Sequence, residues 1–277
     1  MKQIMDGNSA ASKIAYLFSE MAFIYPITPS SPMASNMDNL RTKENYNLFH
    51  DKVRVMEMQS EKGAAGALHG SLLTGTLTTT FTSSQGLLLM LPNLYKIAGE
   101  CLPAVIHVAS RTVATHALSI FGDHSDIYAV RQTGFCMLAS ASPLESYHMA
   151  IIAHLASLKG TLPFIHFFDG FRTSHELNVV DTLNEEDLLK LVPKKELEEF
   201  KNRALNPLKP INYGMNQNED VYFQTVEARS PLYDNMTDIV ENYMEKLNEL
   251  AHTNYHPFTY YGSSDAESVI IAMGSVT

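Results

Sequence analysis

Three side chains stand at positions where they could bind or react with a small molecule: Thr28, Glu61 and Arg111. Glu61 opens a helix built from Gly and Ala, and a carboxyl group kept dry there can share a proton with a ligand nitrogen, because burial disfavours its charged form. Arg111 follows an apolar strand, and its guanidinium can bind a carboxylate through two parallel hydrogen bonds. Thr28 lies between two prolines that would hold its hydroxyl rigidly against a substrate oxygen.

Each of these residues also has a purely structural explanation. Glu61 would complement the dipole of its helix, Arg111 would form an ordinary ion pair, and Thr28 would belong to a rigid turn. Polar residues follow five of the predicted strands, although helix caps also place Ser, Thr and Asp there. The concentration of polar groups at so many strand ends favours a small-ligand site over simple capping.

The other motifs carry less chemistry. Residues 122–126 (GDHSD) resemble a set of metal ligands, but such a cluster in a loop is typical of a hydrogen-bonded turn, and we expect no metal site in this chain. His107 and His166 lie inside apolar strands and are expected to be core residues. The phosphate-binding glycine motifs and the nucleophile elbow are absent. Cys101 and Cys136 are too few to hold an iron–sulfur cluster.

Short apolar runs alternate with helical segments along the first two-thirds of the chain. The predicted strands are 22–25, 53–58, 76–82, 104–109, 135–139 and 163–168, and the predicted helices lie near 9–21, 61–73, 86–97 and 144–158. This alternation predicts an α/β fold, a parallel sheet with helices on both faces. In such sheets ligands bind beyond the carboxyl ends of the strands, where the three candidate residues stand.

The pattern changes from about residue 175. Residues 185–203 and 234–252 read as amphipathic helices, and residues 206–220 as an irregular connection. We expect residues 1–255 to form one domain, with its helical and irregular extension from about residue 175. Residues 267–273 (ESVIIAM) read as a buried strand, so 256–277 are expected to be the start of a second, truncated domain of a longer polypeptide.

Composition excludes several classes of protein. The 277 residues contain 20 Lys and Arg against 30 Asp and Glu, a formal net charge of −10, which argues against nucleic-acid or anionic-membrane partners. Residues 63–95 carry no charge, but Ser, Thr, Gly and Gln interrupt them, so we expect a buried interior or a subunit interface and no membrane span. Two cysteines and no targeting segment indicate a cytoplasmic protein.

Five segments together resemble one family. They are YPITPSSP at 25–32, SEKGAAGA at 60–67, LTTTFTSSQG at 77–86, ALSIFGDHSD at 117–126 and HFFDGFRTSHE at 166–176. They are similar to the N-terminal portion of pyruvate:ferredoxin (or flavodoxin) oxidoreductases, and the similarity runs through the whole chain. The resemblance implies a domain of the type that binds the aminopyrimidine ring of thiamine diphosphate.

The resemblance also implies roles for residues and partners. Glu61 matches the glutamate that hydrogen-bonds the aminopyrimidine nitrogen, and Thr28 and Arg111 match the residues that contact pyruvate. Later domains of the family bind Mg²⁺, the diphosphate and the iron–sulfur clusters. The implied reaction is oxidative decarboxylation of pyruvate to acetyl-CoA and CO₂, with coenzyme A as acceptor of the acetyl group and ferredoxin or flavodoxin as acceptor of electrons. A homodimer is implied as well, and the chain alone is expected to be inactive.

Two other functions stay open at this point. The chain can belong to a related oxidoreductase that acts on a different 2-oxoacid, since substrate contacts from other domains are not visible in it. It can also be a free-standing, non-catalytic module that binds a partner or an anion. The sequence does not decide between ferredoxin and flavodoxin.

Overall fold

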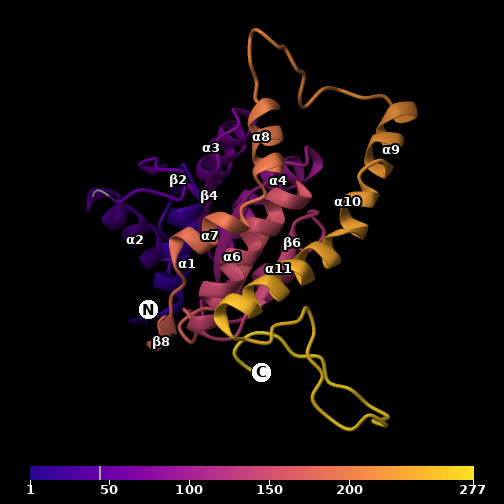
Figure 1. Ribbon diagram of the computed structural model, residues 1–277. Coiled ribbons are helices and arrows are strands. Elements are labelled where there is room, and N and C mark those ends of the chain that lie inside the picture. The colour runs from indigo at the N-terminus through magenta and orange to yellow at the C-terminus, as the bar shows by residue number, and fades with distance from the viewer. Residues whose placement is uncertain (44) are drawn as a thin grey trace.

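A six-stranded parallel sheet forms the centre of the computed structural model, which describes residues 1–43 and 45–277 (Figure 1). The strands lie in the order β3-β2-β4-β5-β7-β6, and all neighbours run parallel. They are β2 (Met21–Ile24), β3 (Arg54–Glu57), β4 (Thr78–Thr82), β5 (Val105–Ser110), β6 (Cys136–Ser140) and β7 (Phe164–Asp169). All six predicted strands are present, and the predicted α/β fold is confirmed.

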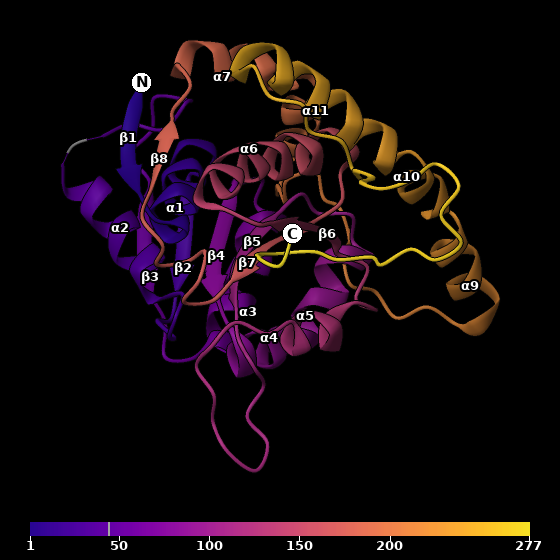
Figure 2. The ribbon, with the colours of Figure 1, turned by 90° about the horizontal axis from the view of Figure 1, so that it is seen from below.

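Helices cover both faces of this sheet, as the view along its edge shows (Figure 2). One face carries α3 (Glu61–Leu73), α4 (Ser84–Gly99) and α5 (Ser125–Val130), which pack against one another in that order. The other face carries α1 (Gly7–Phe18), α2 (Ser31–Thr42) and α6 (Pro143–Gly160), with α11 (Met236–Ala251) outside α6. Right-handed crossovers between parallel strands require this division of the helices.

The central strands are buried although they contain polar residues. All five residues of β4 (TTTFT) are buried. The hydroxyl of Thr79 donates to the Val105 carbonyl at 2.8 Å, and that of Thr80 donates to the Phe23 carbonyl at 2.6 Å. Because these hydroxyls are hydrogen-bonded to neighbouring strands, their burial costs little.

Three histidines form a buried chain between the sheet and α6. The Nδ1 atoms of His107 and His166 are 2.9 Å apart, and Nε2 of His107 lies 3.2 Å from Nε2 of His154. His107 and His166 are fully buried, which confirms that they are core residues. Burial lowers the pKa of His107 to about 3 and that of His166 well below its ordinary value, so both rings are neutral at pH 7.

Several elements lie outside the sequence predictions. A separate two-stranded antiparallel sheet pairs β1 (Lys2–Met5) with β8 (Asn178–Asp181) and ties the N-terminus to the segment after β7. The helix predicted over 185–203 is broken into α7 (Glu185–Leu191) and α8 (Lys194–Asn202). Pro193 causes the break, because it lacks an N–H and excludes the helical conformation at the residue before it.

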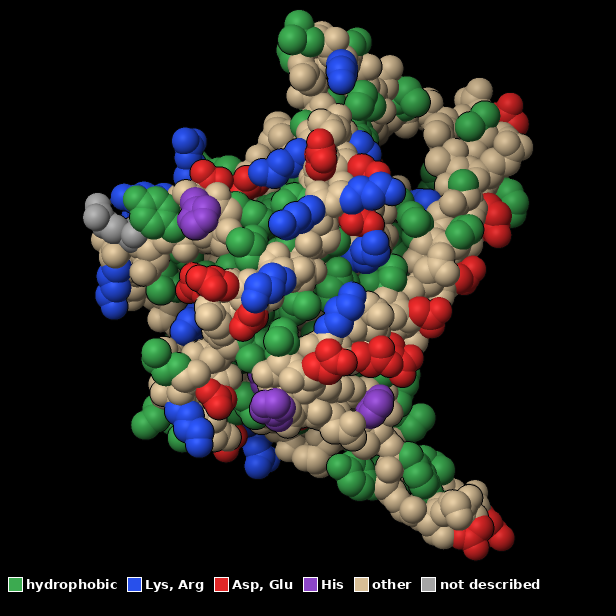
Figure 3. Space-filling model, in the orientation of Figure 1, with side chains coloured by type: hydrophobic (Ala, Val, Ile, Leu, Met, Phe, Trp, Pro, Cys, Tyr) green, Lys and Arg blue, Asp and Glu red, His purple; other side chains and the backbone are tan. Residues whose placement is uncertain are grey.

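The C-terminal third lies along the outside of the molecule. After the irregular connection come α9 (Glu219–Glu227), α10 (Ser230–Asp234) and α11, and α9 stands away from the body in Figure 1. Acidic and basic side chains are intermixed over α7 and α8 in the space-filling view, as expected of a solvent-exposed layer (Figure 3).

The strand predicted over 267–273 is absent, so this expectation was wrong. Val269, Ile270 and Ile271 are 62%, 93% and 91% exposed. A strand needs a neighbour for its N–H and C=O groups, and no other segment in the described ranges pairs with this one. The tail instead crosses back to the end of β7, where Ser275 contacts Asp169.

Candidate functional site

Glu61 lies at the carboxyl edge of the sheet, in the connection that follows β3. It is the first residue of α3, whose N-cap Ser60 accepts a hydrogen bond from the Gly63 amide at 3.0 Å. The Glu61 residue is only 6% exposed, yet its carboxylate has no hydrogen-bond partner among residues 1–43 and 45–277. A buried carboxylate without a partner is costly, so its position calls for a ligand that carries a donor.

The turn between β4 and α4 fits closely against Glu61. A Cβ placed on Gly86 would lie 2.9 Å from Oε1 of Glu61 and 2.5 Å from Oγ1 of Thr82, so only glycine fits between them. The hydroxyls of Thr82 and Ser83 are buried and unpartnered in the described part of the chain. Three polar groups without partners, two of them fully buried, therefore lie around the start of α4.

Arg111 is held from two sides at the end of β5. Its Nη1 donates to the Thr28 carbonyl at 2.7 Å, and its Nη2 donates to Oε1 of Gln85 at 2.9 Å. The residue is 7% exposed, and its Nε is buried with no partner within the described residues. Burial lowers the pKa of Arg111, and the charge of Asp126 offsets part of that effect. The guanidinium nonetheless keeps its positive charge at pH 7.

Thr28 meets Arg111 through its backbone and not through its hydroxyl. The Thr28 residue is exposed, and its hydroxyl makes no hydrogen bond to the rest of the described chain. The loop that carries it is packed tightly, since a Cβ on Gly170 would lie 2.6 Å from Cγ of Pro29. The Asn8 side chain further fixes the loop by donating to the Pro29 carbonyl at 2.9 Å.

The structure thus brings the three predicted residues to one edge of the sheet. Glu61 abuts Gly86, the neighbouring Gln85 binds Arg111, and Arg111 binds the backbone of Thr28. This continuous chain of contacts joins the ends of β2, β3, β4 and β5. Gln85 belongs to the polar residues that follow a predicted strand, but the sequence did not single it out as a site residue, and its hydrogen bond with Arg111 is seen only in the structure.

Residues 122–126 form a hydrogen-bonded cluster, as expected from their sequence. Oδ1 of Asp123 accepts from the Ser125 amide at 2.7 Å, and His124 Nε2 lies 2.6 Å from Oδ1 of Asp169. Burial alone would raise the pKa of Asp169, but hydrogen bonds from His124 and Ser275 outweigh it and lower that pKa to about 2. The hydrogen bond to Asp169 raises the pKa of His124.

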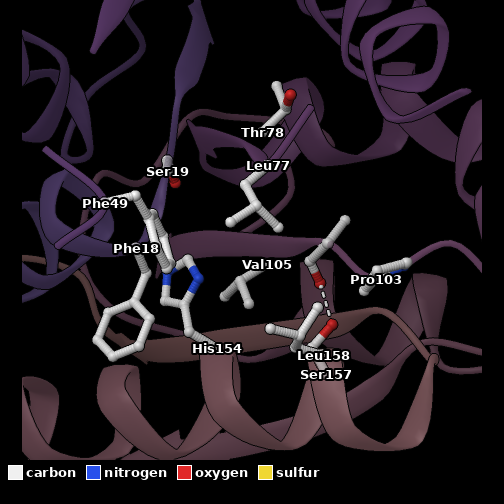
Figure 4. A pocket seen from close by; sticks show the side chains of 11 residues that line it. Phe18, Ser19, Phe49, Leu77, Thr78, Pro103, Val105, His154, Ser157 and Leu158 are labelled. Carbon is white, nitrogen blue, oxygen red and sulfur yellow. Dashed lines mark hydrogen bonds between the residues drawn. The ribbon is translucent and has the colours of Figure 1, made fainter. Parts of the chain in front are cut away.

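Two cavities lie at the opposite, amino edge of the sheet. The smaller one, about 20 Å³, is lined mainly by apolar side chains at the starts of β4 and β5, with His154 at its side (Figure 4). The larger one, about 680 Å³, lies over the starts of β2 and β3. Neither touches the candidate site.

Residues 1–43 and 45–277 contain neither a cluster of metal ligands nor a membrane-spanning helix. Within these ranges no group of three or more His, Cys, Asp or Glu side chains could hold a metal ion. No helix there has the length and apolar character needed to cross a bilayer.

Comparisons with known proteins agree with this architecture. Residues 13–245 match a family model described as pyruvate flavodoxin/ferredoxin oxidoreductase, thiamine diphosphate-binding. The chain is 57% identical to pyruvate:ferredoxin oxidoreductase of Moorella thermoacetica, over 99% of this chain and 23% of that protein. It is 54% identical to pyruvate-flavodoxin oxidoreductase of Klebsiella pneumoniae, over 98% of this chain and 23% of the relative.

Two more distant comparisons add to the picture. Pyruvate dehydrogenase [NADP(+)] of Cryptosporidium parvum is 51% identical, over 99% of this chain and 14% of its own length. Among solved structures, 2-oxoglutarate:ferredoxin oxidoreductase from Magnetococcus marinus superposes with a TM-score of 0.59 at 20% identity, over 67% of this chain and 32% of that one, which supports the fold alone.

The chain spans about a quarter or less of the length of these curated relatives. The two matches of 57% and 54% identity each extend over nearly the whole of this chain. This chain therefore belongs to the pyruvate flavodoxin/ferredoxin oxidoreductase family and is a thiamine diphosphate-binding domain from the N-terminal portion of such an enzyme.

Proposed function

We propose that this chain holds the aminopyrimidine ring of thiamine diphosphate in an enzyme that oxidatively decarboxylates pyruvate to acetyl-CoA and CO₂. The observation that carries the proposal is the position of Glu61 at the carboxyl edge of the sheet, where the residue is only 6% exposed and its carboxylate has no hydrogen-bond partner among the described residues. When bound, the cofactor supplies the carbon nucleophile that attacks the ketone of the substrate. Glu61 would hold a proton between its carboxyl group and a ring nitrogen.

The residues around Glu61 fit such a ring. The carboxylate offers an acceptor to a protonated ring nitrogen, and the unpartnered hydroxyls of Thr82 and Ser83 offer further donors or acceptors beside it. Gly86 leaves room next to the carboxylate where any side chain would collide. This donor set suits a flat heterocycle with several nitrogens and needs no metal in this chain.

Arg111 and Thr28 supply the proposed contacts to the substrate carboxylate. The guanidinium is fixed by the Thr28 carbonyl and by Gln85, so little rotamer freedom is left to lose on binding. The exposed hydroxyl of Thr28 would donate to the same carboxylate. These contacts recognise a group that all 2-oxoacids share, so the choice of pyruvate over longer acids depends on residues outside this set.

The electron acceptor, ferredoxin or flavodoxin, would act on parts of the polypeptide outside this chain. Relatives named for ferredoxin, flavodoxin and NADP(+) are 51–57% identical to this chain, which supports an acceptor site elsewhere. We place Mg²⁺, the iron–sulfur clusters and coenzyme A with those parts too. The chain alone would then not turn over pyruvate.

Two assignments on domains and assembly complete the proposal. Residues 1–255 would form the pyrimidine-binding domain and residues 256–277 would lead into the next one. In the uncharged stretch 63–95, Leu89 and Tyr95 are 49% and 48% exposed on α4, and these exposed apolar side chains support a homodimer contact through this helix.

Equilibrium binding of thiamine diphosphate tests the central assignment. In the natural polypeptide, Glu61→Gln should weaken cofactor binding by about 10- to 100-fold, because a hydrogen bond to a charged group is lost. Glu57→Gln, an exposed carboxylate at the end of β3, is the matched control and should bind normally. Binding to the Glu61→Gln protein within twofold of wild type would overturn the proposal.

A further inference from the structure

The Asp126 carboxylate is the most heavily hydrogen-bonded buried group near the candidate site. It is fully buried at the start of α5. Its Oδ2 accepts from the backbone amides of Ser84 at 2.8 Å and Arg111 at 3.1 Å. Its Oδ1 accepts from the Ser110 hydroxyl at 2.6 Å and from the Ile127 amide at 2.8 Å.

These contacts join the carboxyl ends of two strands, β4 and β5, that are distant in sequence. Ser84 begins α4, shortly after β4, while Ser110 ends β5 and Arg111 is the residue that follows it. Asp126 therefore sets the spacing between the ends of these two strands. Ser84 has a positive φ of 47°, which is unfavourable for a residue with a side chain, so its conformation depends on such fixed partners.

The backbone of Arg111 and one of the two anchors of its side chain depend on the same carboxylate. The Arg111 backbone is bound to Asp126 directly. Its guanidinium is bound to Gln85, and the Gln85 oxygen in turn accepts from the Ser84 hydroxyl at 2.6 Å. Ser84 is itself fixed by Asp126. A shift of the carboxylate would thus move the base of the arginine and one of its two side-chain partners.

We propose that Asp126 is a positioning residue for Arg111 and fixes the direction from which the guanidinium meets the carboxylate of a 2-oxoacid. This inference rests on the proposed function, because it requires that Arg111 binds the substrate. Asp126 does not touch the substrate, and none of its hydrogen bonds reaches Glu61. Its effect should therefore fall mainly on substrate binding, because it reaches the proposed cofactor site only indirectly, through the start of α4.

The chemistry of the site requires a full carboxylate. Four donors converge on the two oxygens, two on each. An asparagine of the same shape would turn an NH₂ group toward one pair of donors, which would force them apart. Asp126→Asn is therefore the variant that removes the positioning with the least change in volume.

The first experiment separates KM from kcat in the natural polypeptide. Asp126→Asn should raise KM for pyruvate by about 10- to 100-fold, a typical effect of misplacing a binding group, with a smaller change in kcat. The affinity for thiamine diphosphate should change by a clearly smaller factor than KM for pyruvate, because Asp126 reaches the cofactor site only through the start of α4. Asp123→Asn, an exposed carboxylate three residues away, is the matched control and should leave both constants unchanged.

A double-mutant cycle shows whether Asp126 acts through Arg111. Arg111→Lys should raise KM on its own, and adding Asp126→Asn should raise it no further, because the anchored group is already gone. Hydrogen exchange at the Ser84 and Arg111 amides gives an independent readout. The exchange at both amides should be faster in the Asp126→Asn single variant and unchanged in Arg111→Lys. If that variant does not fold, Ser110→Ala removes one donor to the carboxylate and should raise KM by about two- to fivefold.

The outcomes separate this inference from the proposed function. If Arg111→Lys leaves KM unchanged, Arg111 does not bind the substrate, and both proposals are overturned. Suppose instead that Arg111→Lys raises KM. The role of Asp126 is then overturned if Asp126→Asn only lowers thermal stability, or if the effects of the two substitutions on KM multiply. In both cases the proposed function stands. A raised KM that does not add to that of Arg111→Lys supports the inference.

Discussion

At the scale of single residues, most polar groups of the site are hydrogen-bonded, and a few have no hydrogen-bond partner in the described part of the chain. Arg111 is satisfied at two of its three nitrogens. In the described part of the chain the hydroxyls of Thr82 and Ser83 are buried without partners, and the carboxylate of Glu61, a residue only 6% exposed, makes no hydrogen bond. Buried polar atoms without partners are rare in folded proteins, so their clustering at one sheet edge marks where a ligand belongs.

Gly86 gives the sharpest test at this scale. In Gly86→Ala the new Cβ would lie 2.9 Å from Glu61 Oε1 and 2.5 Å from Thr82 Oγ1, so the carboxylate must move. We expect thiamine diphosphate binding to weaken at least tenfold, with a loss of about 1–3 kcal/mol in the free energy of unfolding from overpacking. Titration calorimetry and urea denaturation measure the two effects.

Gly99→Ala, at the other end of the same helix, is the control. There the nearest atom to a new Cβ is Nη1 of Arg229 at 3.3 Å, the movable end of a flexible side chain. Cofactor binding should be normal in this variant. Equal loss of binding in both variants would show that Gly86 acts through the helix and not through Glu61.

The residues of the site were only partly predictable from the sequence. Glu61, Arg111 and Thr28 were found because the carboxyl ends of parallel strands share an edge. The sequence predicted that Asp126 belongs to a turn, whereas it lies in the first turn of α5. Its partners Ser84 and Arg111 lie 42 and 15 residues away, and no local pattern points to them. For Thr28 the sequence drew attention to the hydroxyl, whereas the observed contact to Arg111 is made by the carbonyl.

At the scale of elements, a strand or helix was predicted correctly where its own residues show the pattern typical of it. The six central strands are short apolar or Thr-rich runs, and α3 begins and ends where the sequence placed it. The β1–β8 pair was missed because both strands are short and partly polar, and their register joins residues about 175 apart. The strand predicted over 267–273 has the right composition but no neighbour in the described chain.

The contact of the tail with β7 leads to a prediction at this scale. Because its pKa is raised, His124 should titrate above its ordinary value of 6.5. The His124–Asp169 pair therefore stabilises the fold at lower pH and loses that contribution as pH rises through the pKa of His124. It also fails in acid, between the ordinary value of 3.8 and the lowered pKa of Asp169, about 2.

Asp169→Asn removes the main cause of the raised pKa of His124. The pKa of His124 should therefore fall in this variant, and NMR titration measures it. The Ser275 amide, which donates to Asp169 at 2.8 Å, should lose its protection from hydrogen exchange. Asp265→Asn, an exposed carboxylate on the same tail, should change neither quantity. An unchanged His124 titration in Asp169→Asn would refute the pairing.

At the scale of the whole molecule, the buried histidines make the fold sensitive to acid. His107 and His166 are neutral in the folded chain, with the pKa of His107 at about 3, but both take up protons below about pH 6.5 when unfolded. The unfolded state then binds more protons, so stability falls as pH drops from 6.5 toward 3. In that range His107 contributes about 1.4 kcal/mol per pH unit, and His166 adds a contribution of the same sign.

Urea denaturation of the 277-residue chain at several pH values measures this slope. His166→Gln should make the dependence on pH shallower by about one proton, and the exposed His116→Gln should not. A stability that stays flat between pH 6.5 and pH 4 would contradict the neutral histidine chain.

The account as a whole depends on the carboxyl group of Glu61 meeting a nitrogen of the aminopyrimidine ring. Exchange of the thiazolium C2 proton of bound thiamine diphosphate with deuterated solvent tests this most directly, followed by NMR after acid quench in the natural polypeptide saturated with cofactor. We predict that Glu61→Gln slows this exchange by at least about 100-fold, the usual range for loss of a positioned proton-transfer group, while Glu57→Gln exchanges normally. Exchange at the wild-type rate in the Glu61→Gln protein would contradict the account.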